Sequence, residues 1–328
     1  MINEIAFTKF RAIERAALPL GPLNLLVGPN GTGKTTVLEA VRFIRNQGTF
    51  ADYLTLGAQL SELELRAKLE ISNRKFQWTA KGNGGGLIGL DNRPMGPADT
   101  IAYDQWRGRI RHYAFDASKM RAPVTIQPHQ ELNETGANLA GFLDFLRDNG
   151  SANFEALEHA MSRCLPEFDE IGFDRPSNGH KALKLHRRGR NDFIAAGNLS
   201  EGTLYTLALL AMAFQPFMPA VVCIEEPDRG IHPRLFREVY DALCRLSFPD
   251  RKEATHQPIQ VIVTTHSPHF LNQFTEHPER VIVCERKPQE GVTFRNLGSD
   301  PAAREILEDS LIGDAWYAGA LGGVPANN

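Results

Sequence analysis

The sequence has few cysteines, no long hydrophobic run and almost no excess of charge. Its cysteines, which are far apart in the sequence, are Cys164, Cys223, Cys244 and Cys284. They have neither the paired spacing of a zinc site nor the density of a disulfide scaffold. No segment reaches the roughly 18 consecutive apolar residues that a membrane-spanning helix needs, and the charged start does not resemble a secretory signal. We therefore expect reduced thiols, a cytoplasmic location and no membrane partner.

The 36 basic and 39 acidic side chains nearly cancel and leave a formal net charge of -3. Proteins that coat polyanions carry a large positive excess, so any contact with DNA must come from a local patch. The one clear basic cluster consists of Lys181, Lys184, Arg187, Arg188 and Arg190. Its alternate members would either line a phosphate groove or form a solvated strand face, and the sequence leaves both interpretations open.

The sequence does contain four motifs in a fixed order, and the first is GPNGTGKTT at 28–36. It has all the fixed positions of a phosphate-binding loop, between a predicted strand at 23–27 and a predicted helix at 35–45. The amides of such a loop surround phosphates at a helix N-terminus, the lysine neutralises the β and γ phosphates, and a hydroxyl binds Mg²⁺. The predicted ATP-binding residues are Asn30, Gly31, Thr32, Gly33, Lys34, Thr35 and Thr36, with Thr35 as a Mg²⁺ ligand.

Two adjacent carboxylates end the apolar run VVCIEEP at 221–227. Side chains alternate along a strand, so these carboxylates point to different sides and can divide two roles. We expect Glu225 to hold Mg²⁺ through water and Glu226 to act as the catalytic base that polarises the attacking water. In VIVTTHS at 261–267, His266 ends the next predicted strand, where a neutral imidazole would bind the γ-phosphate and orient water.

The remaining motif is NLSEGT at 198–203, directly before a predicted helix. Serine and glycine in this position also form an ordinary helix cap. Between a phosphate loop and a carboxylate strand, however, Ser200, Glu201 and Gly202 indicate a second anion site. That site requires a γ-phosphate supplied by another subunit.

The apolar runs AVVCI and VIV favour a parallel sheet covered on both faces. Strict alternation over 62–71 predicts a half-buried antiparallel strand, followed by another at 75–80. Residues 139–147 and 153–164 look helical, and GNGGG at 82–86 is interpreted as a loop tip or a linker. No segment sustains the apolar heptads of a long coiled coil.

These motifs resemble the ABC-type ATPase head of the SMC, RecF and OLD group over nearly the whole chain, with EEPDRGIHP, LSEGT and THSPHFLN similar to the carboxylate, signature and switch-histidine motifs. The resemblance implies an α/β P-loop NTPase fold with a mixed, largely parallel core sheet, an antiparallel β subdomain and a helical insert. It also implies a homodimer that encloses two ATP molecules, with Ser200 and Gly202 of one copy reaching the ATP held by Lys34 of the other. Arg11 falls where related heads carry a basic residue near the nucleotide.

The members of this group that the chain resembles are short, coiled-coil-free ATPases often associated with antiphage defence or nucleases. Too few residues follow His266 for the TOPRIM nuclease domain of the OLD pattern, so we expect a nuclease on a separate chain. Trp316 and Tyr317 would either anchor such a partner or pack in the core.

We expect a single domain over residues 1–328. Its parts are an N-terminal lobe with the phosphate loop (1–115), a mainly helical insert (116–190), a lobe with the other three motifs (191–290) and a tail (291–328). The predicted function is an Mg²⁺-dependent ATPase whose dimerisation regulates a nuclease in antiphage defence or DNA repair. The alternatives are the ATPase subunit of a transporter and a DNA-binding repair clamp, whereas the absence of an NKxD sequence argues against a GTPase.

Overall fold

The computed structural model describes residues 1–46, 53–82, 84–90, 95–127, 131–215, 217–249, 257–287 and 290–323. The chain divides into two compact units. Unit 1 contains Met1–His112, Pro219–Ile224 and Pro258–Asn328, and unit 2 contains Tyr113–Met218 and Glu225–Gln257. The single-domain organisation expected from the sequence stays a prediction.

Unit 1 contains a six-stranded sheet built on the predicted apolar strands. Its order is β15-β14-β3-β13-β12-β7. The strands are β3 (Leu23–Val27), β7 (Ile110–Tyr113), β12 (Val221–Glu225), β13 (Gln260–Thr265), β14 (Val281–Lys287) and β15 (Gly291–Asn296). β3 pairs in parallel with β13 and β14, whereas β15 is an antiparallel edge strand. Every residue of β3 and β13 is buried, as expected for strands covered on both faces.

Two backbone hydrogen bonds show how the other strands of this sheet begin. The amide of Gln260 donates to the carbonyl of Ala220 at 3.1 Å, and the amide of Ala220 donates to the carbonyl of Arg109 at 2.8 Å. Gln260 opens β13, while Ala220 and Arg109 stand directly before β12 and β7. Because the three strands begin side by side, they run in the same direction and end at the same edge of the sheet.

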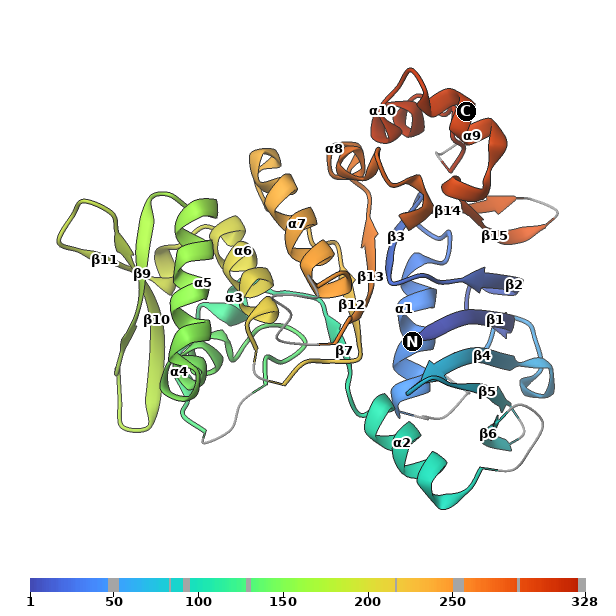
Figure 1. Cartoon of the computed structure of the whole chain (residues 1–328), viewed down its shortest axis with the longest axis horizontal. Helices are drawn as coiled ribbons and strands as arrows, with labels where there is room; N and C mark the ends of the chain where they lie inside the picture. Colours follow the sequence, from blue (N-terminus) through green and yellow to red (C-terminus); the bar gives the residue numbers. More distant parts are fainter. Residues whose placement is uncertain are drawn as a thin grey trace. The chain divides into compact units, whose positions relative to one another are not determined.

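A five-stranded antiparallel sheet accompanies it in the same unit (Figure 1). Its order is β2-β1-β4-β5-β6, with β1 (Ile2–Phe10), β2 (Ile13–Pro19), β4 (Glu64–Ile71), β5 (Arg74–Lys81) and β6 (Gly84–Leu90). The alternation predicted from the sequence is present in β4, where Leu65 and Leu69 are buried while Arg66 and Lys68 are exposed. The loop tip expected at 82–86 is wrong for residues 84–86, which open β6. Sheet hydrogen bonds involve only backbone groups, so glycines can form them as well as other residues do. Here the glycine-rich segment pairs with the edge of β5.

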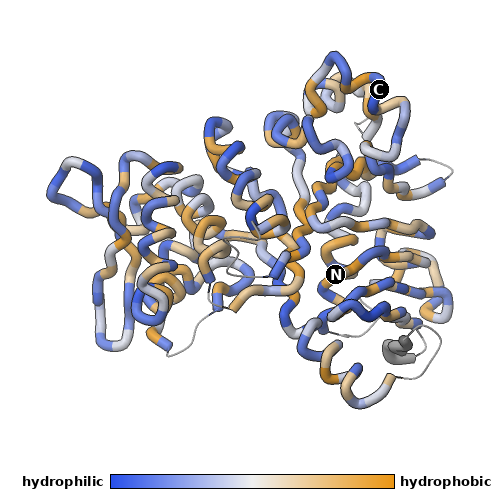
Figure 2. Tube along the Cα trace, in the orientation of Figure 1, coloured by the Kyte–Doolittle hydropathy of each residue, from blue (hydrophilic) through white to orange (hydrophobic). Residues whose placement is uncertain are grey.

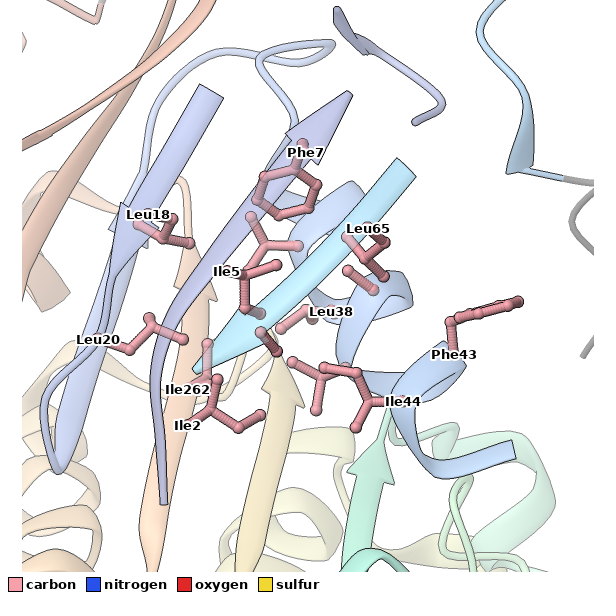
Figure 3. Close-up of a cluster of buried hydrophobic side chains, with 14 of the residues drawn as sticks. Ile2, Ile5, Phe7, Leu18, Leu20, Leu38, Phe43, Ile44, Leu65 and Ile262 are labelled. Carbon is pink, nitrogen blue, oxygen red and sulfur yellow. The ribbon is translucent and has the colours of Figure 1, made fainter. Parts of the chain in front are cut away.

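Helix α1 (Lys34–Asn46) buries its apolar face in a cluster that both sheets of unit 1 share. Figure 3 shows Ile5 of β1 and Leu65 of β4 beside Leu38 of α1, with Ile262 of β13 in the same cluster. Helix α2 (Pro97–Arg107) adds the buried aromatic side chain of Tyr103. Burial of each large apolar side chain contributes roughly 1.5–3 kcal/mol, so this core fixes the phosphate loop that precedes α1.

The remaining elements of unit 1 are short. They are η2 (Leu60–Glu62), α8 (Pro268–Leu271), η5 (Asn272–Phe274), η6 (Pro278–Arg280), η7 (Leu297–Ser299), α9 (Pro301–Leu307) and α10 (Ile312–Tyr317). Trp316 is 7% exposed and donates its indole N–H to the carbonyl of Gly323 at 3.1 Å, whereas Tyr317 is 77% exposed. Of the two aromatic residues considered as a partner anchor, Trp316 therefore packs in the core and Tyr317 lies on the surface.

Unit 2 is a helical layer with its own sheet. It contains α3 (Ala117–Met120), β8 (Val124–Thr125), α4 (Leu139–Asn149), α5 (Ser151–Cys164), β9 (Phe168–Asp174), β10 (His180–Arg187), β11 (Phe193–Ala195), η3 (Ala196–Asn198), α6 (Glu201–Ala213), η4 (Pro233–Leu235) and α7 (Phe236–Ser247). Strand β10 pairs with β8, β9 and β11, so the insert expected to be mainly helical also carries strands. Figure 2 shows hydrophobic and hydrophilic residues alternating along α7, as in an amphipathic helix. Within the described residues, no helix has the length and apolarity required to cross a bilayer.

His112 of β7 is a buried histidine without a hydrogen-bond partner for Nε2 among the described residues. Burial, assisted by the positive charges of Arg42 and Arg45, lowers the pKa of His112 to about 3. The folded chain therefore holds His112 neutral at pH values at which an unfolded chain would protonate it.

We expect the free energy of unfolding to fall by about 2 kcal/mol through His112 between pH 7 and pH 5, because the unfolded side chain binds a proton near pH 6.5 that the folded one excludes. The loss begins near pH 6.5 and continues downward towards pH 3. Urea unfolding at both pH values measures it. The variant His112→Gln should show a smaller pH dependence, while His269→Gln, at an exposed position, should match the wild type. An unchanged dependence in His112→Gln would contradict the assignment.

Candidate functional site

The glycine-rich loop joins β3 to α1 in unit 1, as its sequence predicted. A Cβ atom on Gly28 would lie 2.2 Å from the carbonyl oxygen of Cys284, so only glycine fits where the loop leaves the strand. Gly31 and Gly33 have positive φ angles of 78° and 91°, which residues with side chains rarely adopt. The loop thus wraps tightly around the N-terminus of α1, where backbone amides and the helix dipole favour an anion.

Lys34 places its charge inside this loop. Its side chain is almost fully buried, and Nζ donates to the carbonyls of Gly28 at 2.7 Å and Pro29 at 2.8 Å. Thr32 also donates to the carbonyl of Pro29, at 2.8 Å, and stiffens the turn. Thr35 is exposed in the first turn of α1 while Thr36 is buried, so the Thr35 hydroxyl is the one that a metal ion can reach. Asn30 and Gly31 are exposed at the tip of the loop.

The register of the sheet brings His266 next to the phosphate loop. Thr265 of β13 pairs with Val27 of β3, so the residues that follow them, His266 and Gly28, leave the same edge of the sheet side by side. His266 is exposed. The Ser267 hydroxyl accepts a hydrogen bond from the Phe270 amide at 3.2 Å and caps α8, which fixes the turn after the histidine.

The two carboxylates follow the buried part of β12. Glu225 is the last residue of the strand and is exposed, whereas Glu226 is half-buried with a φ angle of 46°. This left-handed conformation costs a non-glycine residue on the order of 1–3 kcal/mol and is typical of functional sites. The Arg229 amide donates to the Glu226 carbonyl at 3.0 Å, which holds the turn closed.

A cavity of about 560 Å³ in unit 2 is lined by Glu225 and Glu226. Three further charged side chains, which the sequence did not single out for this site, line it as well: Asp116, Lys119 and Arg229. Asp116 caps α3 through the Ser118 amide at 3.0 Å, and the Ser118 hydroxyl lowers the pKa of this carboxyl. Aspartate is a favoured residue at the start of a helix, so the sequence could have indicated the capping role of Asp116. Only the fold shows that Asp116 lines the same cavity as the two glutamates.

The signature residues form the N-terminus of α6. The Ser200 hydroxyl accepts a hydrogen bond from the Thr203 amide at 3.1 Å, so it has the capping role that the sequence also allowed. Ser200 and Glu201 are exposed, and Glu201 lines the same cavity as the two glutamates. A Cβ atom on Gly202 would lie 2.5 Å from the carbonyl oxygen of Gly230, so this glycine lets the helix approach the segment after Glu226.

Arg11 lies over Tyr53, with its guanidinium carbon 4.9 Å from the ring centroid. One of its terminal nitrogens is 3.8 Å from a carboxylate oxygen of Glu39, on α1. Arg11 is therefore tied to the helix that follows the phosphate loop, and its contact with nucleotide stays a prediction.

The residues present fit an Mg²⁺ ion that is bound together with a nucleotide. No group of three or more His, Cys, Asp or Glu side chains suited to a metal ion occurs in the described parts of the chain. Mg²⁺ needs no such group when phosphates and water supply most of its ligands. The exposed Thr35 hydroxyl and Glu225 carboxylate are hard oxygen donors of the required kind.

The basic cluster is largely neutralised by neighbouring carboxylates. Lys181, expected on a groove or a solvated face, is buried and hydrogen-bonded to Asp144 of α4, so it is unavailable to either. Lys184 pairs with Asp174 at 2.5 Å, and Arg187 pairs with Asp192. These contacts do not favour a phosphate-lined groove along β10.

Heads of SMC proteins are among the solved structures with a similar fold. The head bound to the C-winged helix domain of ScpA has a TM-score of 0.60, covering 90% of this chain and 97% of that chain at 12% identity. The head with an extended coiled coil from Pyrococcus furiosus, bound to the C-terminal domain of ScpA, has a TM-score of 0.58 at 13% identity and covers 94% and 98%. Together with the phosphate loop, these similarities define the fold class as that of an α/β P-loop ATPase.

The chain belongs to the family described as "AAA domain, putative AbiEii toxin, Type IV TA system", which matches residues 23–79 and 92–272. An OLD nuclease from Thermus scotoductus is 23% identical over 395 residues, covering 94% of this chain and 70% of that protein. The DNA replication and repair protein RecF of Proteus mirabilis is 28% identical over 141 residues, covering 42% and 35%. The chain is therefore an SMC/RecF/OLD-like ATPase, and the family and the fold class predicted from the sequence are confirmed.

We expect Gly202→Ala to destabilise the chain by about 1–3 kcal/mol, because the added methyl group collides with the Gly230 carbonyl. Gly197→Ala is the matched control, since a Cβ atom there meets nothing within 4 Å. Chemical unfolding measures both. Equal stability of the two variants would show that the backbone around Gly202 relaxes without cost.

Proposed function

We propose that two copies of this chain close around two ATP molecules and that the closure controls a nuclease acting on nucleic acid. In each site one copy supplies the phosphate loop, with Lys34 and the amides of 30–36. The other copy supplies Ser200 and the Gly202 amide at the N-terminus of α6. Arg11 completes the nucleotide pocket from the side of α1.

The proposed chemistry assigns one task to each side chain. Glu226 accepts the proton of the attacking water, and His266 binds the γ-phosphate and orients that water. The Lys34 ammonium neutralises charge on the β and γ phosphates as the bond to the leaving oxygen breaks. Thr35 and Glu225 would hold Mg²⁺, which supplies further charge neutralisation when bound.

One observation carries this proposal: the pairing of Val27 with Thr265 joins the phosphate loop and His266 at one sheet edge. The left-handed backbone at Glu226 supports its role as base, because such strain is typical of catalytic positions. The shared site is supported by the exposure of Ser200 and Glu201 at a helix N-terminus, in a different unit from the phosphate loop.

The proposal of a nuclease partner is supported by similar proteins. One of them is named as a nuclease, and this chain matches 70% of its length. A head of the same fold is bound to a domain of another protein, ScpA. We therefore propose a separate nuclease of the TOPRIM type as the regulated partner, with antiphage defence or DNA repair as the setting.

Glu226→Gln should lower the ATP hydrolysis rate about 100-fold or more while ATP still binds, because the amide cannot accept the proton. The trapped complex should be a dimer with ATP and Mg²⁺ in light scattering coupled to gel filtration. Glu305→Gln on α9, an exposed residue, should hydrolyse ATP like the wild type. A Glu226→Gln chain that hydrolyses ATP normally, or stays monomeric with ATP, would exclude the mechanism.

A further inference from the structure

A second cleft in unit 2 is lined by side chains from four parts of the chain, three of which contribute cationic groups. Its volume is about 730 Å³, and its lining includes His159, Ser162, Arg163, Arg188, Phe214 and Arg245. These come from α5, from the segment after β10, from the end of α6 and from α7. No Asp or Glu side chain is part of the described lining. None of these residues belongs to one of the four ATPase motifs, and Arg188 is the one that belongs to the basic cluster.

The arginines of this cleft are of two kinds: two have no hydrogen-bonding partner among the described residues, and the third is held by hydrogen bonds to uncharged groups. In the described part of the chain, no residue forms a hydrogen bond or ion pair with the side chain of Arg163 or Arg245. Arg188 donates from Nε to the carbonyl of Pro166 at 2.8 Å and also bonds to the Ser162 hydroxyl. His159 stands one helical turn before Arg163 on α5, on the same face. Glu158 acts on His159, and Glu238 acts on Cys164 beside Arg163 and Arg245. Among the described residues, however, no carboxylate forms an ion pair with an arginine of the cleft, so a bound anion reduces the repulsion between these arginines.

The extent of the positive region indicates whether the ligand is a compact anion or a long polyanion. A nucleic-acid strand requires cations that continue beyond a single cleft. Along β10, however, Lys184 and Arg187 are paired with carboxylates, so these two side chains do not extend the positive lining of the cleft along the strand. A volume of 730 Å³ falls within the usual size of small-molecule sites.

We propose that this cleft binds a compact phosphate compound with several negative charges, of the nucleotide class, separately from the ATP of the phosphate loop. Planar guanidinium groups bind phosphate through two parallel hydrogen bonds, and several arginines together suit an anion with more than one negative charge. Phe214 adds an aromatic side chain against which a base can pack. Helix α6 begins after Ser200 and ends just before Phe214, so the ligand contacts the end of the signature helix. Regulation through this helix would rest on the proposed function, but binding does not.

Titration calorimetry measures the binding of inorganic pyrophosphate to the Lys34→Ala chain, in which the phosphate loop contributes little. We expect binding at one remaining site, the cleft. The double change Arg163→Glu and Arg245→Glu should weaken its affinity at least about tenfold, since it removes charged hydrogen bonds to the phosphates and adds two negative charges beside them. Arg175→Glu is the matched control, at an exposed arginine of the same unit outside the cleft, and should bind like the parent. The milder pair Arg163→Gln and Arg245→Gln serves if the double glutamate variant does not fold.

Absence of pyrophosphate binding to the Lys34→Ala chain, or equal binding by the cleft variants, would overturn the proposal. Tighter binding of ADP than of pyrophosphate through the same arginines supports a nucleotide, and equal binding supports a simpler phosphate compound. A single-stranded oligonucleotide that binds through these arginines while pyrophosphate does not would contradict a compact ligand. ATP hydrolysis by the wild type is measured separately, so failure of the cleft and failure of the ATPase mechanism are distinguishable.

Discussion

The parallel pairing of β3 with β13 is the contact on which the candidate site depends. It aligns Val27 with Thr265, and the chemistry follows in the next residues, Gly28 and His266. Both strands are fully buried, so a slip of one residue would disrupt the side-chain packing on both faces of the sheet. The hydrogen bond from Gln260 to Ala220 then sets the start of β12, which ends at Glu225. Hydrophobic burial therefore fixes the position of polar groups at the edge of the sheet.

The sequence predicted those features that depend on local pattern. The limits of β3 agree with the predicted strand, because a continuous apolar run bounded by turns leaves little choice. The phosphate loop was equally predictable, since its glycines and lysine have fixed spacing. The glycines at 84–86 misled because composition suggests a loop, whereas the free edge of β5 makes a strand. The strand β9 and the helix α2 lack a strong periodic signal and were not predicted.

Other features follow from contacts that no local pattern encodes. Lys181 reads as part of a basic strand, but in the fold it is buried against Asp144, which stands on a different element. Asp116 reaches the cavity of Glu226 only because α3 packs beside α6, where the Ala117 amide donates to the Tyr205 hydroxyl at 3.3 Å. Such placements depend on tertiary packing, so they required the structure.

The central claim is that each ATP is bound by the phosphate loop of one copy and by Ser200 of the other. Mixing two inactive variants tests it most directly: Lys34→Ala, which lacks the loop ammonium, and Ser200→Arg, which blocks the α6 N-terminus. If the site is shared, a mixed dimer contains one intact site formed by Lys34 from one variant and Ser200 from the other. The account predicts that ATP hydrolysis returns on mixing. If each variant folds and forms dimers, yet the mixture hydrolyses no ATP at any ratio, the result would contradict the shared site.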